Sequence, residues 1–362
     1  MSALVDAQRA AARELLDPAA LAYYESGAGS EITRREARAA WSHYRLRPRV
    51  LTDVADVDLS LELFGARLRT PLLVAPTAFH RLAHAEGELA TARGATASGS
   101  LMVVSTRSST PLEVVAEACG GPWWFQVYAT RDPAVHRALA LRARDAGATA
   151  LVLTGDTPYV GRKPRSDGPG VPGIEQMIAV NTAQHLAPGA AADAVDQTPA
   201  VTVAMIDELA TLTGLPVLVK GVLRGDEAAR CVAAGAAGVV VSTHGGRQLD
   251  RVVPSAYALP DVVAAVGERV PVLVDGGICS GLDALTALAL GARAVLLGRP
   301  VLWALAAGGA DGVRELLDTL GDDLEHVMAL AGAPRLADLT PDLVTAGGGA
   351  TAWGHGASDP GH

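Results

Sequence analysis

The chain has 362 residues, of which 49% are hydrophobic and 19% are charged, a composition that excludes an intrinsically disordered protein. Thirty Lys and Arg residues against 39 Asp and Glu residues give a net charge of −9, so neither a basic surface nor a nucleic acid partner is expected. Three scattered cysteines form no disulfide framework and indicate a reducing compartment. The first residues lack the apolar segment of a signal peptide, and no apolar run approaches the roughly 18 residues of a membrane span. We therefore expect a globular cytoplasmic protein.

Eight short apolar runs recur through the middle of the chain, and each is followed by a stretch with helical spacing. Continuous apolar runs are typical of parallel strands that are covered on both faces. The runs occupy residues 72–78, 101–106, 123–128, 150–156, 216–222, 238–245, 271–277 and 294–300. This repeat predicts an α/β fold, a (β/α)₈ TIM barrel. A doubly wound open sheet is the alternative, but the first run is not followed by a glycine-rich fingerprint.

Three segments lie outside the regular repeat. Residues 1–70 are expected to form an N-terminal helical extension, and residues 71–343 the barrel. Within the barrel, the Gly- and Pro-rich segment 157–200 predicts a long loop of the kind that serves as a lid or is disordered. Residues 344–362 are expected to be a disordered tail.

Polar and ionisable residues follow nearly all of the predicted strands, where barrel enzymes place their active sites. Lys220 is one of only two lysines among thirty basic residues, and it ends an apolar strand, so a compact positive charge is indicated there. His244 ends another strand and precedes two glycines, and Asp156 could orient it as a base. Polar strand ends also meet solvent in proteins without this chemistry, but that explains only one or two such residues.

The last two predicted strands end in glycine-containing turns, DGGICSG and LGRP. The loops after strands seven and eight commonly form phosphate sites in barrels, so backbone amides and Arg299 are expected to hold a phosphate there. No P-loop, no dinucleotide fingerprint and no zinc-ligand spacing is present in the sequence, and no metal site is expected.

Ten motifs in chain order resemble those of the FMN-dependent α-hydroxy acid oxidase and dehydrogenase family, which includes glycolate oxidase, lactate oxidase, mandelate dehydrogenase and hydroxymandelate oxidase. The similarity extends from about Leu21 to Leu343, and HGGRQLD together with VKGV is its most specific part. APTAFHRLAH and the short fourth loop resemble the hydroxymandelate type in particular. The motifs are AYYESGAG, LRPRVL, APTA, WFQVY, DTP, LVKGV, STHGGRQLD, VDGG, ALALGA and GRP.

The resemblance implies a role for each matching residue. His244 paired with Asp156 would be the base, Tyr128 would bind the substrate hydroxyl, and Lys220 would stabilise the reduced flavin. It does not decide whether the base removes the hydroxyl proton or the Cα proton. The substrate carboxylate would bind Arg247 and Tyr23, with Lys163 nearby. FMN would be lined by Pro76, Thr77, Ala78, Ser105, Gln126, Thr154, Lys220, Ser242, Asp275, Gly277, Gly298 and Arg299.

Four positions depart from the family pattern. Thr243 stands where the family has Asn, and Gly155 replaces the Val of TVDTP. Lys163 replaces a second arginine, which in the family reaches the active site from the loop. Cys279 replaces an arginine that in the family binds the flavin phosphate.

The resemblance implies an FMN-dependent (S)-2-hydroxy acid oxidase or dehydrogenase that forms a homotetramer, with mandelate or 4-hydroxymandelate as a candidate substrate and oxygen as the acceptor. Phe79 and Arg107 are expected near the substrate side chain. Two alternatives stay open: oxidative decarboxylation, as in lactate monooxygenase, and a non-catalytic barrel that binds flavin poorly. The colour of the purified protein and the identity of the product distinguish them.

Overall fold

The computed structural model describes residues 3–164, 171–191 and 193–347 and contains the predicted TIM barrel. All eight predicted strands are present, so the sequence prediction of an α/β barrel is confirmed. The barrel strands are β4 (Leu72–Val74), β5 (Val103–Ser105), β6 (Trp124–Val127), β7 (Ala150–Thr154), β8 (Val217–Val222), β9 (Gly238–Val241), β10 (Val272–Asp275) and β11 (Ala294–Leu297).

The barrel strands are hydrogen-bonded in the order β4-β11-β10-β9-β8-β7-β6-β5, and the pairs are parallel. An isolated parallel bridge between Val74 and Met102 brings the two ends of this sheet together and closes it into a barrel. Since all eight strands run the same way, their carboxyl ends and the residues that follow them share one rim.

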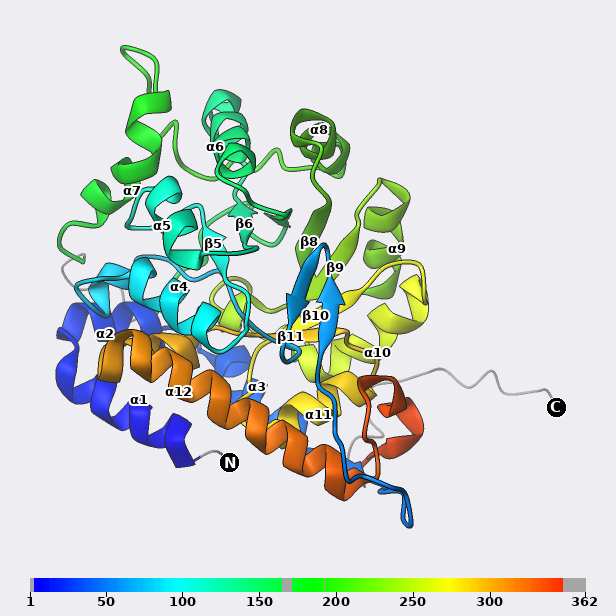
Figure 1. The fold of residues 1–362 in the computed structure, drawn as a ribbon. Coiled ribbons are helices and arrows are strands. Elements are labelled where there is room, and N and C mark those ends of the chain that lie inside the picture. The colour runs from blue at the N-terminus through cyan, green and yellow to red at the C-terminus, as the bar shows by residue number, and fades with distance from the viewer. Residues whose placement is uncertain (1–2, 165–170, 192, 348–362) are drawn as a thin grey trace.

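Helices follow the strands along the chain and cover the outside of the barrel (Figure 1). Several begin at residues that suit a helix start: Asp132 caps α6 and precedes a proline, and the Ser280 side chain accepts a hydrogen bond from the Asp283 amide in α11. The helices around the barrel are α4 (Glu88–Ala97), α5 (Leu112–Cys119), α6 (Pro133–Asp145), α7 (Ile174–Thr182), α8 (Ala204–Thr213), α9 (Gly225–Ala233), α10 (Ser255–Val266), α11 (Gly281–Ala289) and α12 (Arg299–Ala331).

A β-hairpin packs on the interior residues of the barrel strands. It consists of β2 (Leu61–Leu63) and β3 (Ala66–Leu68), whose leucines share one buried cluster with inward-facing residues such as Leu218 and Leu273. Phe64 at the hairpin turn contacts Trp124, the first residue of β6. The hairpin therefore covers the amino ends of the strands, opposite the rim expected to hold the site.

The N-terminal segment forms three helices: α1 (Ala3–Leu15), α2 (Pro18–Glu25) and α3 (Ile32–Ser42). Helix α1 lies along α12 at one side of the barrel (Figure 1). Helix α3 contacts α10, α11 and the short turn His244–Gly246. The extension thus reaches the carboxyl rim of the barrel.

Two parts of the structure differ from the sequence expectation. The segment 157–200, expected to be a loop, contains α7 and the 3₁₀ turn Ala183–His185, and Asn181 in it is buried. The segment expected to be a disordered tail begins with β12 (Val344–Ala346), which pairs antiparallel with β1 (Tyr44–Leu46). Backbone pairing with β1 thus orders the residues of β12, although their amino acid composition does not predict a strand. Residues 165–170, 192 and 348–362 lie outside the described part of the chain.

In the described ranges, no helix is long and apolar enough to cross a membrane.

Candidate active site

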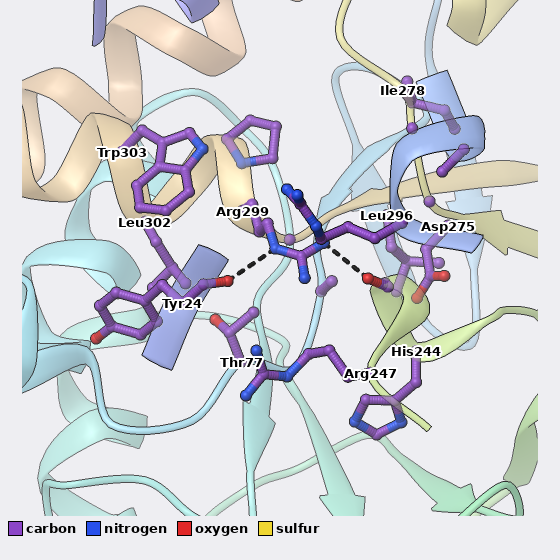
Figure 2. Close-up of a pocket in the computed structure, with 18 of the residues that line it drawn as sticks. Tyr24, Thr77, His244, Arg247, Asp275, Ile278, Leu296, Arg299, Leu302 and Trp303 are labelled. Atoms are coloured by element: carbon purple, nitrogen blue, oxygen red, sulfur yellow. Dashed lines mark hydrogen bonds between the residues drawn. The ribbon is translucent and has the colours of Figure 1, made fainter. Parts of the chain in front are cut away.

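A cavity of about 270 Å³ opens at the carboxyl rim of the barrel. Figure 2 shows His244 and Arg247 on one side of Arg299 and Trp303 on the other. The structure brings together at this cavity most of the site residues predicted from the sequence. Those that line it are Tyr23, Pro76, Thr77, Ala78, Ser105, Tyr128, Lys220, His244, Arg247, Asp275, Gly277, Gly298 and Arg299.

His244 is held between Asp156 and Tyr128. Its Nδ1 lies 3.1 Å from Asp156 Oδ1, and its Nε2 lies 3.4 Å from the Tyr128 hydroxyl. Burial raises the pKa of Asp156, but the charge and hydrogen bond of His244 and the charge of Lys220 outweigh it, so the pKa lies below its usual value. An ionised Asp156 favours a proton on Nδ1 of the neutral imidazole, which leaves Nε2 as the basic atom.

The backbone of β8 makes room for the Asp156 side chain. Gly221 adopts a φ of +102°, and a Cβ on it would lie 2.5 Å from the Asp156 Cβ. Only glycine adopts this positive φ without strain and also leaves the space that the Asp156 side chain occupies. His244 also has a positive φ of 54°, and its amide donates to Ser242 Oγ. A strained turn anchored to the strand end therefore fixes the imidazole.

The Arg247 guanidinium is anchored by the segment that follows helix α2. Its Nη1 donates to the carbonyl oxygens of Tyr23 and Ser26, at 2.6 and 3.0 Å, and its Cζ lies 4.8 Å from the centre of the Tyr23 ring. Its Nε and Nη2 have no hydrogen-bond acceptor in the described part of the chain. They leave two donors at the cavity, as bidentate binding of a carboxylate requires.

Lys220 is buried at the floor of the cavity. Its Nζ donates to Ser242 Oγ at 2.7 Å and lies 3.0 Å from Asp275 Oδ2. Asp275 Oδ1 is buried and has no partner among the described residues. A buried carboxylate oxygen without a hydrogen-bond donor lowers the stability of the fold unless a ligand supplies the donor. This oxygen is therefore a candidate acceptor for a ligand hydroxyl.

Three predicted residues lie behind the cavity wall: Gln126 and Ser242 are one hydrogen bond from a lining residue, and Thr154 is two. Gln126 Oε1 accepts from Ser105 Oγ at 3.1 Å, and its Nε2 donates to Thr154 Oγ1 at 2.9 Å. Ser242 contacts Lys220. Gln126, Thr154 and Ser242 do not line the cavity, but they fix the side chains that do.

Arg299 is embedded in backbone carbonyl groups. Its Nε, Nη1 and Nη2 donate to the carbonyl oxygens of Tyr24, Gly245 and Ser26, at 2.8 to 2.9 Å. Figure 2 shows two of these hydrogen bonds as dashed lines. Burial lowers the pKa of this guanidinium, without neutralising it at pH 7. All three nitrogens are thus engaged with the protein, although a guanidinium has five N–H groups and two remain.

Lys163 does not line the cavity. Its Nζ donates to the carbonyl oxygen of Gly161 at 2.8 Å. Burial, and to a lesser extent the charge of Arg247, lowers its pKa to about 8. The structure therefore places Lys163 in the neighbourhood of Arg247, in contact with its own loop.

Sequence reasoning missed the contribution of the N-terminal helices. Asp6 and Arg9 of α1, Arg34, Ala37 and Arg38 of α3, and Tyr24 and Glu25 of α2 all line the cavity, as does Trp303 of α12. No local motif distinguishes the residues of α1, α3 and α12, because long-range packing docks these helices at the rim. Tyr24 and Glu25 lie in the motif AYYESGAG, from which only Tyr23 was assigned to the site.

The fold and these side chains together define an enzyme of the α/β barrel class, with an oriented imidazole base, an arginine with free donors and a buried lysine at one cavity. In the described ranges, no three His, Cys, Asp or Glu residues are placed to hold a metal ion.

Comparisons with known proteins agree with this class. The FMN-dependent dehydrogenase family matches residues 12–346. L-lactate oxidase from Nostoc sp. is 45% identical over 344 residues, which cover 91% of this chain and 94% of the relative. 4-Hydroxymandelate oxidase from Amycolatopsis orientalis is 44% identical over 338 residues, with the same coverage. A crystal structure of mandelate oxidase with (S)-4-hydroxymandelic acid is 41% identical, with a TM-score of 0.87, and covers 95% of this chain and 99% of its own.

The chain belongs to the FMN-dependent dehydrogenase family. It is an FMN-dependent enzyme that oxidises 2-hydroxy acids. This confirms the resemblance seen in the sequence, and neither oxidative decarboxylation nor a non-catalytic barrel is favoured.

The residues at the cavity fit FMN. The cavity has polar donors from Lys220 and Ser105, an unpaired acceptor on Asp275, and arginines from several elements. Gly276, Gly277 and Gly298 line it without side chains. A flavin needs donors for its ring, acceptors for its ribityl hydroxyls and cations for its phosphate, and this set supplies all three.

Proposed function

We propose that this enzyme oxidises an (S)-2-hydroxy acid with an aryl side chain, of the mandelate or 4-hydroxymandelate type, to the 2-oxo acid, with oxygen as the final electron acceptor. The observation that carries the chemistry is the hydrogen-bonded series Asp156–His244–Tyr128 beside Arg247. The substrate class is supported by the similarity to 4-hydroxymandelate oxidase and to mandelate oxidase. L-lactate oxidase is equally similar, so substrate size is the point to test.

In this proposal the substrate carboxylate is bound by Arg247 and Tyr23. The free Nε and Nη2 of Arg247 offer two parallel donors, and the Tyr23 hydroxyl is without a partner among the described residues. The carbonyl groups of Tyr23 and Ser26 fix the guanidinium before the substrate arrives. A donor pair fixed in advance loses little conformational freedom on binding.

Oxidation of a 2-hydroxy acid to a 2-oxo acid releases two electrons and two protons. FMN, when bound, would supply the acceptor for the two electrons and for the proton that His244 does not take. His244 takes one proton at Nε2, and the nearby Asp156 carboxylate stabilises the imidazolium that results. Tyr128 keeps its proton, since burial raises its pKa above the usual value, and its hydroxyl therefore serves as a hydrogen-bond donor to the substrate oxygen.

Lys220 and Asp275 are proposed to hold the flavin. Lys220 brings a buried positive charge to the strand end and would stabilise negative charge on the reduced cofactor. The unpaired Asp275 Oδ1 would be available to accept a hydrogen bond from a ribityl hydroxyl. Gln126, Thr154 and Ser242 support this arrangement from behind, as their hydrogen bonds indicate.

Aromatic and cationic residues around the carboxylate site suit an aryl substrate. The Tyr23 ring contacts Phe79, with centroids 5.8 Å apart, and Tyr128 faces the same region. Behind them, Arg107 is buried, and its Nη1 has no partner among the described residues. Neither Phe79 nor Arg107 lines the cavity, so the flat surfaces offered to an aryl ring are those of Tyr23 and Tyr128.

The test is a substrate panel in which turnover is measured as oxygen consumption. The substrates (S)-lactate, (S)-mandelate and (S)-4-hydroxymandelate are compared by kcat/KM. We expect both aryl substrates to be preferred over lactate, with stoichiometric 2-oxo acid and peroxide as products. A preference for lactate would contradict the aryl assignment. Carbon dioxide and a shortened carboxylic acid in place of the 2-oxo acid would contradict simple oxidation.

The cytoplasmic location, the homotetramer and the site roles given above stay predictions. Sedimentation of the purified holoenzyme would test the assembly.

A further inference from the structure

The cavity does not end at the barrel rim but continues to the two N-terminal helices α1 and α3. Beyond Gly277 it is lined by Ile278 and Cys279, by Asp6 and Arg9 of α1, and by Ala37 and Arg38 of α3. The glycine-containing turn after β10 forms this part of the wall, so a ligand phosphate at the turn would meet the two helices.

Helix α3 is fixed directly against that turn. The Trp41 Nε1 atom donates to the carbonyl oxygen of Gly276 at 2.8 Å. A Cβ on Gly277 would collide with the carbonyl group of Ala37, so only glycine permits this close approach. Because Arg38 follows Ala37, this contact fixes the position of Arg38 at the turn.

The other groups at this end of the cavity are a neutral thiol and arginines that already have partners in the protein. Burial raises the pKa of the Cys279 thiol to about 11, so it is neutral at pH 7. Arg299 already donates from each of its nitrogens to a carbonyl oxygen. Arg9 shares the Glu25 carboxylate with Arg13, and Arg34 pairs with Glu31. A phosphate dianion carries two negative charges, so a further cation at this end of the cavity would strengthen its binding.

Arg38 has the right place for that cation. Its Nη1 and Nη2 lie 3.0 and 3.4 Å from the Asp6 carboxylate oxygens, and its side chain is 34% exposed. Arg38 and Cys279 line the same cavity, and Asp283 as well as Asp6 acts electrostatically on Arg38. The Asp6 pair holds the guanidinium in one orientation, and three of its five N–H groups remain for a second partner.

We propose that Arg38, oriented by Asp6, supplies the cation that binds the FMN phosphate in this enzyme, where residue 279 is an uncharged cysteine. The inference rests on the FMN dependence of the chain and assigns one new residue to the cofactor site. It involves no step of the reaction.

The test compares two flavins that differ only in the phosphate. The apo-protein is titrated with FMN and with riboflavin at low ionic strength, and binding is followed by flavin fluorescence. We expect Arg38→Gln to weaken FMN binding about tenfold, the value of one charge-assisted contact at a partly solvated site. Riboflavin binding is expected to be unchanged, because riboflavin has no phosphate.

Three further variants make the result specific. Arg35→Gln removes an exposed arginine from the same helix that does not line the cavity, and it should change neither affinity. Asp6→Asn removes the carboxylate that orients Arg38 but keeps the cation, and it should weaken FMN binding less than Arg38→Gln does. Adding Cys279→Arg to Arg38→Gln returns a cation to the turn and should restore the preference for FMN over riboflavin.

An unchanged ratio of FMN to riboflavin affinity in Arg38→Gln would overturn the proposal while leaving FMN dependence intact. A wild-type chain that binds neither flavin would overturn FMN dependence itself. If Arg38→Gln does not fold, Arg38→Lys serves instead: it keeps the charge, loses the fork, and should show a smaller loss confined to FMN.

Discussion

The Asp156 carboxylate lies 3.1 Å from Nδ1 of His244, while the opposite ring nitrogen lies 3.4 Å from the Tyr128 hydroxyl. Asp156 is supplied by the end of β7, Tyr128 by β6 and His244 by β9. Three separate strand ends thus orient one imidazole, and the direction in which it accepts a proton is set before substrate binds.

The first prediction concerns that imidazole. We expect His244→Ala to bind FMN but to lose flavin reduction by substrate by about 10²–10⁴-fold, the usual contribution of a general base. Anaerobic stopped-flow measurement of flavin bleaching checks this. His326→Ala removes an exposed histidine of α12 as a control. Bleaching of His244→Ala at nearly the wild-type rate would show that another group is the base.

The second prediction concerns Arg247. In Arg247→Lys, a point charge replaces a fork that binds two backbone carbonyls and still has free donors. We expect the dissociation constant of a substrate-like carboxylate to rise about 10- to 100-fold, the equivalent of one charged hydrogen bond at about 1.5–3 kcal/mol. Flavin absorbance changes report this binding, and Arg251→Lys is an exposed control. An unchanged constant would mean that the carboxylate binds elsewhere.

The third prediction concerns pH. The pKa of Lys163 is lowered to about 8 by burial and by Arg247. Its ammonium is therefore present below that pH and lost as the pH rises through it. If this charge assists the substrate carboxylate, KM rises above pH 8 in the wild type. Lys163→Arg, which stays charged, should remove the rise, and an identical pH profile in that variant would exclude the role.

Sequence patterns predicted the barrel because each strand is a short apolar run with its own polar end. Lys220 and His244 stood out for the same reason: a chemically distinct side chain at a strand end is visible locally. The contributions of Arg9, Arg38 and Trp303 were not visible, since they depend on how α1, α3 and α12 dock on the rim.

The segment after β7 shows the limit of composition more clearly. Its many Gly and Pro residues predicted a loop with little contribution to the core. In the structure, Val195 accepts a hydrogen bond from Arg107, and Gln197 forms a β-bridge with Thr130. Long-range partners of this kind cannot be inferred from the amino acids of the segment itself.

The last prediction follows from Asn181, which lies in that segment near the end of α7 and is 1% exposed. Its Oδ1 accepts from the Leu112 amide at 3.1 Å, and its Nδ2 donates to the carbonyl oxygens of Ser108 and Thr110 at 3.2 and 2.9 Å. It thus pairs three backbone groups at the start of α5. We expect Asn181→Ala to lower the free energy of unfolding by about 1–3 kcal/mol, because buried polar groups lose their partners. Urea denaturation of the holoenzyme measures this, with the exposed Gln184→Ala as control. Equal stability of the two variants would show that the Asn181 hydrogen bonds add nothing to the stability of the barrel.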